Sequence, residues 1–258
     1  MGKLSYIPGS SIAHQLFPLT KFTWLLVATV LVFLIQDGRL LMATAVLSAF
    51  ALFSVNRHIW RIRGFSFVLI TGIALFFLYL VFDKSGQVLL NPGYDFLVIS
   101  SGGLLMGLRF SGRFLAIVFM SYIFILTTDP SDLAYALMKV GLPYRYGFMS
   151  VTALRLAPVM EEEGQTIYRA QLVRGVRYDQ GNLRKLLLIF QQFMTPLLIS
   201  ALRRADKLVF SMEGRGFGKQ PVRTFRKRPS ATYLDLVITL CIILYFSVLI
   251  VLNHGSTL

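Results

Sequence analysis

Long, nearly uninterrupted apolar stretches recur along the chain, and they constrain its fold more than any other feature of the sequence. A helix needs about 17–25 apolar residues to cross the hydrocarbon core of a bilayer. Only helices and closed barrels satisfy their own backbone hydrogen bonds there. Five stretches fit such helices, so we predict an all-α membrane protein with about five spans, at residues 19–36, 40–55, 64–82, within 96–126, and 233–252.

Composition agrees with this fold class. Hydrophobic residues make up 55% of the 258-residue chain and charged residues only 15%, where about 25% is usual. That leaves too little polar surface to cover a soluble fold of this length. The single cysteine, Cys241, lies in an apolar stretch, so an internal disulfide is excluded.

The distribution of basic residues predicts the orientation. Segment 127–228 holds 17 of the 26 Lys and Arg residues against 8 acidic residues, and residues 56–63 hold three arginines. Because Lys and Arg are retained on the cytoplasmic side, we predict a multi-pass protein of the inner (plasma) membrane with a cytoplasmic N-terminus and an outer C-terminus. The chain then divides into four spans (1–126), a cytoplasmic segment (127–228) and a last span (229–258).

The net charge of +14 is mostly a topology signal on this interpretation. The basic run at residues 223–228, just before the last span, is typical of an anchor at anionic lipid of the bilayer. No platform of aromatic and basic residues accompanies the run, so nucleic acid is not an expected partner.

The cytoplasmic segment is predicted to form three amphipathic helices, at about residues 129–139, 148–173 and 183–213. A sixth span at 186–202 is the competing interpretation of the third helix. Two adjacent glutamines, a threonine and a proline within it favour a helix that lies along the membrane surface. Its apolar face repeats at steps of three and four, through Leu186, Phe190, Phe193, Leu197, Ala201, Ala205, Leu208 and Met212.

Both long amphipathic helices end in an arginine followed by a glycine. The simplest interpretation is a helix cap, since a cation suits the negative end of a helix and glycine terminates it. The functional interpretation is an arginine presented to an acidic pocket of a partner, because its planar fork pairs with carboxylates and keeps its charge. The residues alone leave both open. The two sets are Val173, Arg174 and Gly175, and Gly214, Arg215 and Gly216.

With these motifs in view, the sequence resembles the transmembrane coupling subunit, or T component, of energy-coupling-factor (ECF) transporters. That family carries a short X-Arg-X motif, often Ala-Arg-Gly, at the end of each of two successive cytoplasmic coupling helices. Residues 173–175 and 214–216 occupy those places. Further similar segments are the lead-in to the first span, at 6–21, and residues 127–133 and 155–158.

The resemblance implies a non-catalytic subunit without a cofactor. Arg174 and Arg215 would dock onto two cytoplasmic ABC-type ATPase subunits, and the membrane helices would hold a small substrate-binding S component that imports a vitamin or a transition-metal ion. Val173 and Gly214 replace the family's frequent leading alanines, so the local docking surface is expected to differ. The alternative is a self-contained secondary transporter, or another membrane protein, whose helix-end arginines are only caps.

No catalytic or metal site is predicted. The three consecutive glutamates at 161–163 point around a helix rather than converge, and the three histidines show no metal-ligand spacing. Residues 214–219 are rich in glycine but lack the spacing of a phosphate-binding loop. We therefore expect ATP to be hydrolysed in other subunits.

Small and charged residues share the fourth span. Gly103, Gly107 and Ser111 recur at four-residue steps, which permits close helix packing, and we expect this face to contribute to contact with the membrane partner. Arg109 and Arg113 lie one turn apart among them. Either they are functional intramembrane charges, or the span begins near residue 112 and both arginines reach the outer head groups.

Overall fold

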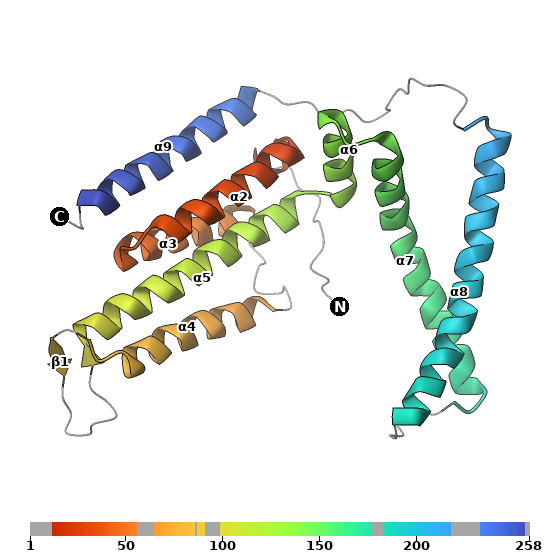
Figure 1. The fold of residues 1–258 in the computed structure, drawn as a ribbon, viewed down its shortest axis with the longest axis horizontal. Coiled ribbons are helices and arrows are strands. Elements are labelled where there is room, and N and C mark those ends of the chain that lie inside the picture. Colours follow the sequence, from red (N-terminus) through yellow and green to blue (C-terminus); the bar gives the residue numbers. More distant parts are fainter. Residues whose placement is uncertain are drawn as a thin grey trace. The chain divides into compact units, whose positions relative to one another are not determined.

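The computed structural model describes residues 12–55, 64–85, 87–90, 99–176, 183–217 and 233–255. Helices dominate these residues, which confirms the predicted all-α class (Figure 1). A two-stranded antiparallel sheet, which the sequence pattern does not predict, precedes the longest membrane helix. The elements are α1 (Ile12–Gln15), α2 (Pro18–Leu34), α3 (Gly38–Val55), α4 (Phe65–Phe82), β1 (Val88–Leu90), β2 (Ile99–Ser100), α5 (Ser101–Thr127), α6 (Pro130–Val140), α7 (Tyr144–Val173), α8 (Leu183–Gly214) and α9 (Tyr233–Gly255).

Within the described residues, four helices are long and apolar enough to cross a bilayer, namely α3, α4, α5 and α9. Helix α2 is also apolar and has 17 residues, which is the short end of the spanning range of about 17–25. These five helices coincide with the five predicted spans to within a few residues. Residues 96–98, included in the range predicted for the fourth span, lie outside the described residues.

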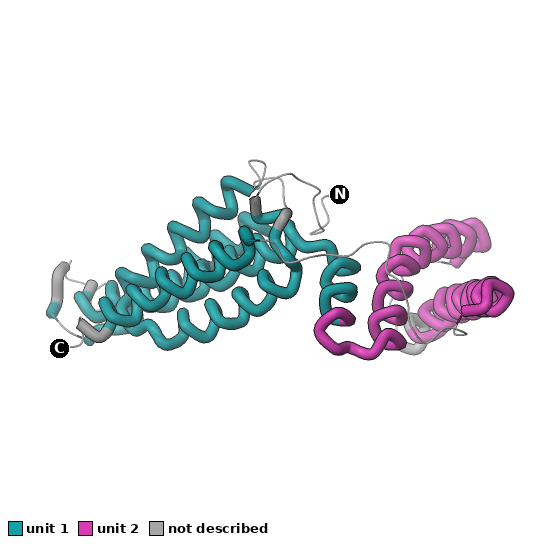
Figure 2. Tube along the Cα trace, turned by 90° about the horizontal axis from the view of Figure 1, so that it is seen from above, with its two compact units in different colours: residues 1–137, 229–258 teal, residues 138–228 magenta. Residues whose placement is uncertain are grey.

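The chain forms two compact units (Figure 2). Unit 1 comprises residues 1–137 and 229–258 and contains all five apolar helices, whereas unit 2 comprises residues 138–228 and contains α7 and α8. The boundary between the units falls inside α6. The last apolar helix, α9, therefore packs with helices that precede it by more than a hundred residues in sequence.

Side-chain caps fix the starts of two helices. The Ser100 hydroxyl accepts a hydrogen bond from the Gly103 N–H at 2.9 Å and donates one to the Asp83 carbonyl at 2.7 Å. It thereby begins α5 and ties it to the end of α4. At the start of α6, Asp129 Oδ1 accepts a hydrogen bond from the Ser131 N–H at 2.8 Å. Caps of this kind stabilise a helix by about 0.5–2 kcal/mol.

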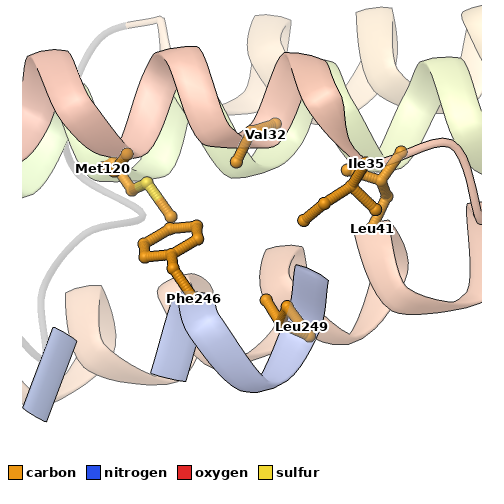
Figure 3. Packing of buried hydrophobic residues seen from close by; sticks show 7 residues of the cluster. Val32, Ile35, Leu41, Met120, Phe246 and Leu249 are labelled. Carbon is orange, nitrogen blue, oxygen red and sulfur yellow. The ribbon is translucent and has the colours of Figure 1, made fainter. Parts of the chain in front are cut away.

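Helix α5 is the centre of unit 1 and packs against α2, α3 and α4. One hydrophobic cluster joins it to α2, α3 and α9, and Figure 3 shows Phe246 of α9 pointing toward Met120 of α5. A second cluster joins α5 to α3 and α4 and contains Leu52, Phe65, Phe119, Tyr122 and Leu126. The outward faces of these helices remain apolar and exposed, as helices in contact with lipid require.

Small residues let α5 approach its neighbours closely. A methyl group added to Gly107 would lie 2.9 Å from the carbonyl oxygen of Phe76 in α4, and one added to Gly112 would lie 2.9 Å from the backbone nitrogen of Met42 in α3. Ser111 is buried between them, and its hydroxyl donates to the Gly107 carbonyl at 2.7 Å. Such distances are too short for any side chain larger than glycine without movement of the backbone.

Gly103 belongs to the same contact, since a methyl group there would lie 2.6 Å from the Asp83 carbonyl oxygen at the end of α4. The sequence predicts that Gly103 and Gly107 face a separate membrane partner. The structure instead places them against the chain's own α4, because the two helices are consecutive and antiparallel and their backbones meet at these glycines. A larger residue at either position would therefore disturb this chain before it disturbed any partner.

Two charged side chains are buried in unit 1 where α2, α5 and α9 meet. The Lys21 ammonium donates a hydrogen bond to the Thr127 carbonyl, the last of α5, at 3.0 Å. Asp235 accepts a hydrogen bond from the Phe17 N–H, just before α2, at 2.7 Å. The cation thus lies at the negative end of one helix and the carboxylate at the positive end of another, so both charges are compensated.

The packing of α5 predicts opposite effects for one substitution at two positions. Gly107→Ala should destabilise the protein by about 1–3 kcal/mol, because the added methyl group meets a backbone oxygen that cannot rotate away. The matched control is Gly164→Ala in α7, where the methyl group would lie 3.5 Å from the Phe193 ring, an ordinary contact. There the higher helix propensity of alanine should stabilise by up to about 1 kcal/mol. Thermal unfolding of the full chain in detergent measures both, and equal midpoints would contradict the close contact.

Candidate functional site

Helices α7 and α8 of unit 2 cross as an antiparallel pair (Figure 1). Near the middle of α7, Glu163 forms an ion pair with Arg204 at 3.3 Å and accepts a hydrogen bond from the Ser200 hydroxyl at 3.0 Å. Nearer its end, the Gln171 amide donates to the Gln192 carbonyl at 3.4 Å. Residue numbers rise along α7 while those of the partners in α8 fall, so the two helix ends point in opposite directions.

Helix α7 ends in a Schellman motif. Arg174 is the C-cap residue, and Gly175 follows with a φ of 85°, in the left-handed region that glycine adopts without strain. The Gly175 N–H donates to the Leu172 carbonyl at 3.0 Å, and the Val176 N–H donates to the Gln171 carbonyl at 3.1 Å. These two bonds define the motif and satisfy the last carbonyls of the helix from the backbone.

Helix α8 ends in the same motif in the same register. Arg215 takes the C-cap position, and Gly216 follows with a φ of 67°. The Gly216 N–H donates to the Glu213 carbonyl at 2.9 Å, and the Phe217 N–H donates to the Met212 carbonyl at 2.9 Å. The sequence predicts a glycine cap at both helix ends, and the structure contains one at each.

The side chains of Arg174 and Arg215 take no part in these caps. Both are exposed, and within the described parts of the chain neither guanidinium has a hydrogen-bond or ion-pair partner. Backbone N–H groups already bind the carbonyls that a capping side chain would reach. The termination of both helices therefore needs the glycine that follows each arginine but not the arginine side chain.

The two arginines lie at opposite ends of the α7–α8 pair. Arg174 follows the last turn of α7. Beyond Arg215, the Phe217 ring packs against Phe148 and Tyr144 in the first turns of α7, with ring centroids 4.9 and 6.3 Å apart. The helix between these points rises about 1.5 Å per residue, which separates the two sites by roughly 40 Å. Neither arginine can therefore share a pocket with the other.

Both arginines are surrounded by surface that is open to a partner. Val173, next to Arg174, is 90% exposed, and added methyl groups at Gly175 and Gly214 would meet no atom within 4 Å. The predicted apolar face of α8 is only partly covered by α7, since Phe193 is half-buried while Phe190 is exposed. The α7–α8 pair thus presents two cationic ends joined by an apolar surface.

Two details of unit 2 depart from the sequence analysis. Helix α7 begins at Tyr144, four residues before the predicted start, because Pro143 provides the N-cap. Gly147, in the first turn of α7, packs against the Met138 side chain of α6. Glu163, one of the three consecutive glutamates predicted to point around the helix, bonds Arg204 and Ser200 of α8. No local pattern announces that role, since it depends on where α7 and α8 cross.

The described residues contain no cluster of three or more His, Cys, Asp and Glu side chains that could hold a metal ion. The basic run at 223–228 lies outside the described residues. The arrangement that remains as a candidate site is the pair of helix ends, which can bind carboxylates through two well-separated guanidinium groups.

The motif geometry predicts which glycines matter. Gly175→Ala and Gly216→Ala should each cost about 1–2 kcal/mol locally, because alanine is strained in the left-handed region. Hydrogen exchange at Val176 and Phe217 should then become faster, since their N–H groups close the two motifs. Gly214→Ala is the matched control, because Gly214 is helical and has open space around it. Unchanged exchange in both cap variants would contradict the assigned motifs.

Comparison with known proteins identifies the family of the chain. The CbiQ family model, described as a cobalt transport protein, matches residues 9–224. The chain is similar to the energy-coupling factor transporter transmembrane protein EcfT of Bacillus selenitireducens, at 30% identity over 85% of the chain and 84% of that protein. It is also similar to the EcfT proteins of Lactococcus lactis subsp. cremoris, at 30% identity over 94% and 96%, and of Bacillus subtilis, at 28% identity over 86% and 87%.

The family match at residues 9–224 includes helices α1 to α8, and the relatives match over most of the chain, so these similarities do not rest on one motif. The chain therefore belongs to the CbiQ family and is a transmembrane component of an energy-coupling factor transporter.

Proposed function

We propose that the chain couples ATP hydrolysis in two cytoplasmic ABC-type ATPase subunits to import through a small membrane S component that binds a vitamin or a transition-metal ion. Arg174 and Arg215 each insert into an acidic groove, one on each ATPase subunit. Closure of the ATPases then moves α7 and α8, and the movement reaches the S component. The chain itself performs no chemistry in this scheme.

The observation that carries the proposal is the repeated helix end. Two consecutive helices terminate in the same motif, and each places at its C-cap an exposed arginine that has no partner among the described residues. The antiparallel crossing sends the two arginines to opposite ends of the pair, which suits two partner subunits rather than one. An isolated cap would need neither the arginine nor its repetition.

Electrostatics favours an acidic partner. Segment 127–228 has 17 basic and 8 acidic residues, so its surface attracts negatively charged grooves and repels basic ones. The arginine side chain forms paired, parallel hydrogen bonds with a carboxylate, which fixes direction as well as position. A rigid cap behind each arginine keeps that direction constant while the helix moves.

The arginines are tested by substitution in the assembled transporter. Arg174→Ala and Arg215→Ala should each weaken ATPase retention or uncouple hydrolysis from uptake, at a cost of about 2–5 kcal/mol for each disrupted charge pair. The double variant should be worse than either single variant. Arg→Lys should restore function only in part, since an ammonium is a point charge without the planar fork. Uptake and co-purified ATPase are measured for every variant.

Matched controls lie on the same helices. Arg169→Ala in α7 and Arg203→Ala in α8 remove exposed arginines that lie more than one helical turn before the C-cap residues, and both should leave uptake unchanged. If Arg174→Ala and Arg215→Ala behave like these controls, the arginines are only part of the helix ends and the coupling role is wrong. Substrate flux by the chain alone in liposomes would instead support a self-contained transporter.

The proposed assembly requires unit 2 to face the cytoplasm, with the N-terminus inside and the C-terminus outside the plasma membrane. In a Cys241→Ser background, a cysteine at Glu162 should react with a membrane-impermeant maleimide only after permeabilisation. A cysteine at Gln87, between α4 and α5, should react in intact cells. Both native residues are exposed, so access is set by the membrane, and the reverse labelling pattern would overturn the orientation.

A further inference from the structure

Arg113 lies midway along α5, and its side chain reaches the C-terminal end of the neighbouring helix α2. Its Nη2 donates hydrogen bonds to the carbonyls of Ile35 at 2.9 Å and Phe33 at 3.4 Å, which are the last carbonyls of α2. A cation is favourable at this negative helix end. Because α2 ends there and α3 begins close to Arg109, the Arg113 guanidinium lies level with the ends of two apolar helices. This position favours the interpretation in which the arginines reach the head groups.

The surface around Arg113 is open to lipid. Its guanidinium lies over the Phe33 ring, 5.2 Å from the centroid, and that ring is 60% exposed. Leu34, the next residue, is exposed to the same extent. Arg113 therefore combines a fixed position, set by the α2 carbonyls, with access from the membrane side of the bundle.

Arg109 lies one turn before Arg113, and no described residue compensates its positive charge. Its Nε is buried without a hydrogen-bond partner, and no intrachain hydrogen bond or ion pair binds the side chain in the part of the chain that the structure describes. Its backbone is held close to α3, since a methyl group added to Gly38 would lie 3.0 Å from the Arg109 nitrogen. The backbone position of Arg109 is therefore fixed, whereas its guanidinium has no partner among the described residues.

The two guanidinium groups repel each other, because like charges four residues apart on a helix are neighbours. The nearest acid along the adjoining turn, Asp37, accepts a hydrogen bond from the Arg39 N–H at 3.0 Å and pairs with neither arginine. Unpaired charge at the edge of an apolar layer is costly. An anion shared by Arg109 and Arg113 would remove the repulsion and supply the missing hydrogen-bond acceptors.

We propose that Arg109 and Arg113 form a binding site for the phosphate of one anionic phospholipid headgroup. Arginine forks match phosphate oxygens in pairs, and basic pockets at the edge of membrane helices suit lipid head groups. The lipid is favoured over free phosphate because its acyl chains would lie along the exposed Phe33 and Leu34 next to the site. A headgroup without a cation of its own adds one net negative charge against the two positive charges of the arginines.

The test uses the full chain, freed of lipid in a phosphate-free detergent, and native mass spectrometry during titration with phosphatidylglycerol. The wild-type chain should retain one phosphatidylglycerol molecule more tightly than phosphatidylcholine. Arg109→Gln should weaken phosphatidylglycerol binding about tenfold or more, the loss expected for one charged hydrogen bond. Arg109→Lys should bind with intermediate affinity. Because the Arg109 side chain makes no bond within the described part of the chain and is repelled by Arg113, neither variant should melt below the wild-type temperature in the absence of lipid.

The matched control is Arg39→Gln, which removes an exposed arginine from the same end of the bundle and should leave lipid binding unchanged. Equal affinity of Arg109→Gln and the wild-type chain would overturn the site. Equal binding of phosphatidylcholine would overturn the preference for an anionic headgroup. Displacement of the lipid by millimolar inorganic phosphate would show a general anion site and would overturn the assignment to lipid.

Discussion

The contact between the backbones of α5 and its two neighbours is the interaction on which the rest of unit 1 depends. In lipid there is little hydrophobic drive for helices to associate, so close packing has to supply it. Gly107 and Gly112 let α5 approach α4 and α3 to distances that no larger residue permits. That approach fixes how far α5 is shifted along its axis relative to its neighbours. At this position Lys21 reaches the last carbonyl of α5, and Arg113 reaches the end of α2.

Positive charge serves three different purposes in this chain. Lys21 and Arg113 bind carbonyls at helix ends and so make the bundle stable. Arg204 pairs with Glu163 where α7 and α8 cross. Arg174 and Arg215 have no intrachain partner among the described residues and remain exposed. The cations of the described residues thus divide into those bound within the fold and those without a partner there, a difference that net charge alone does not reveal.

The identical caps on α7 and α8 connect local structure to the proposed coupling role. A Schellman motif fixes the backbone for two residues beyond the helix, so an arginine at the C-cap moves with the helix as one rigid piece. The packing of Phe217 on Phe148 and Tyr144 extends that rigidity to the end of α8. Force applied to either arginine would therefore move a whole helix rather than a loose loop.

The sequence by itself determined the apolar helices and the two helix ends, because span length and the Arg-Gly pattern are local properties. It predicted α7 to within four residues at its start and α8 to within one at its end. Only the tertiary structure decided which surfaces the small and charged residues meet. Gly107 packs against α4 of the same chain, Glu163 bonds Arg204 of α8, and Arg113 binds the last carbonyls of α2. Those outcomes depend on the axial shift and the crossing of neighbouring helices. Residues that are distant in sequence determine both.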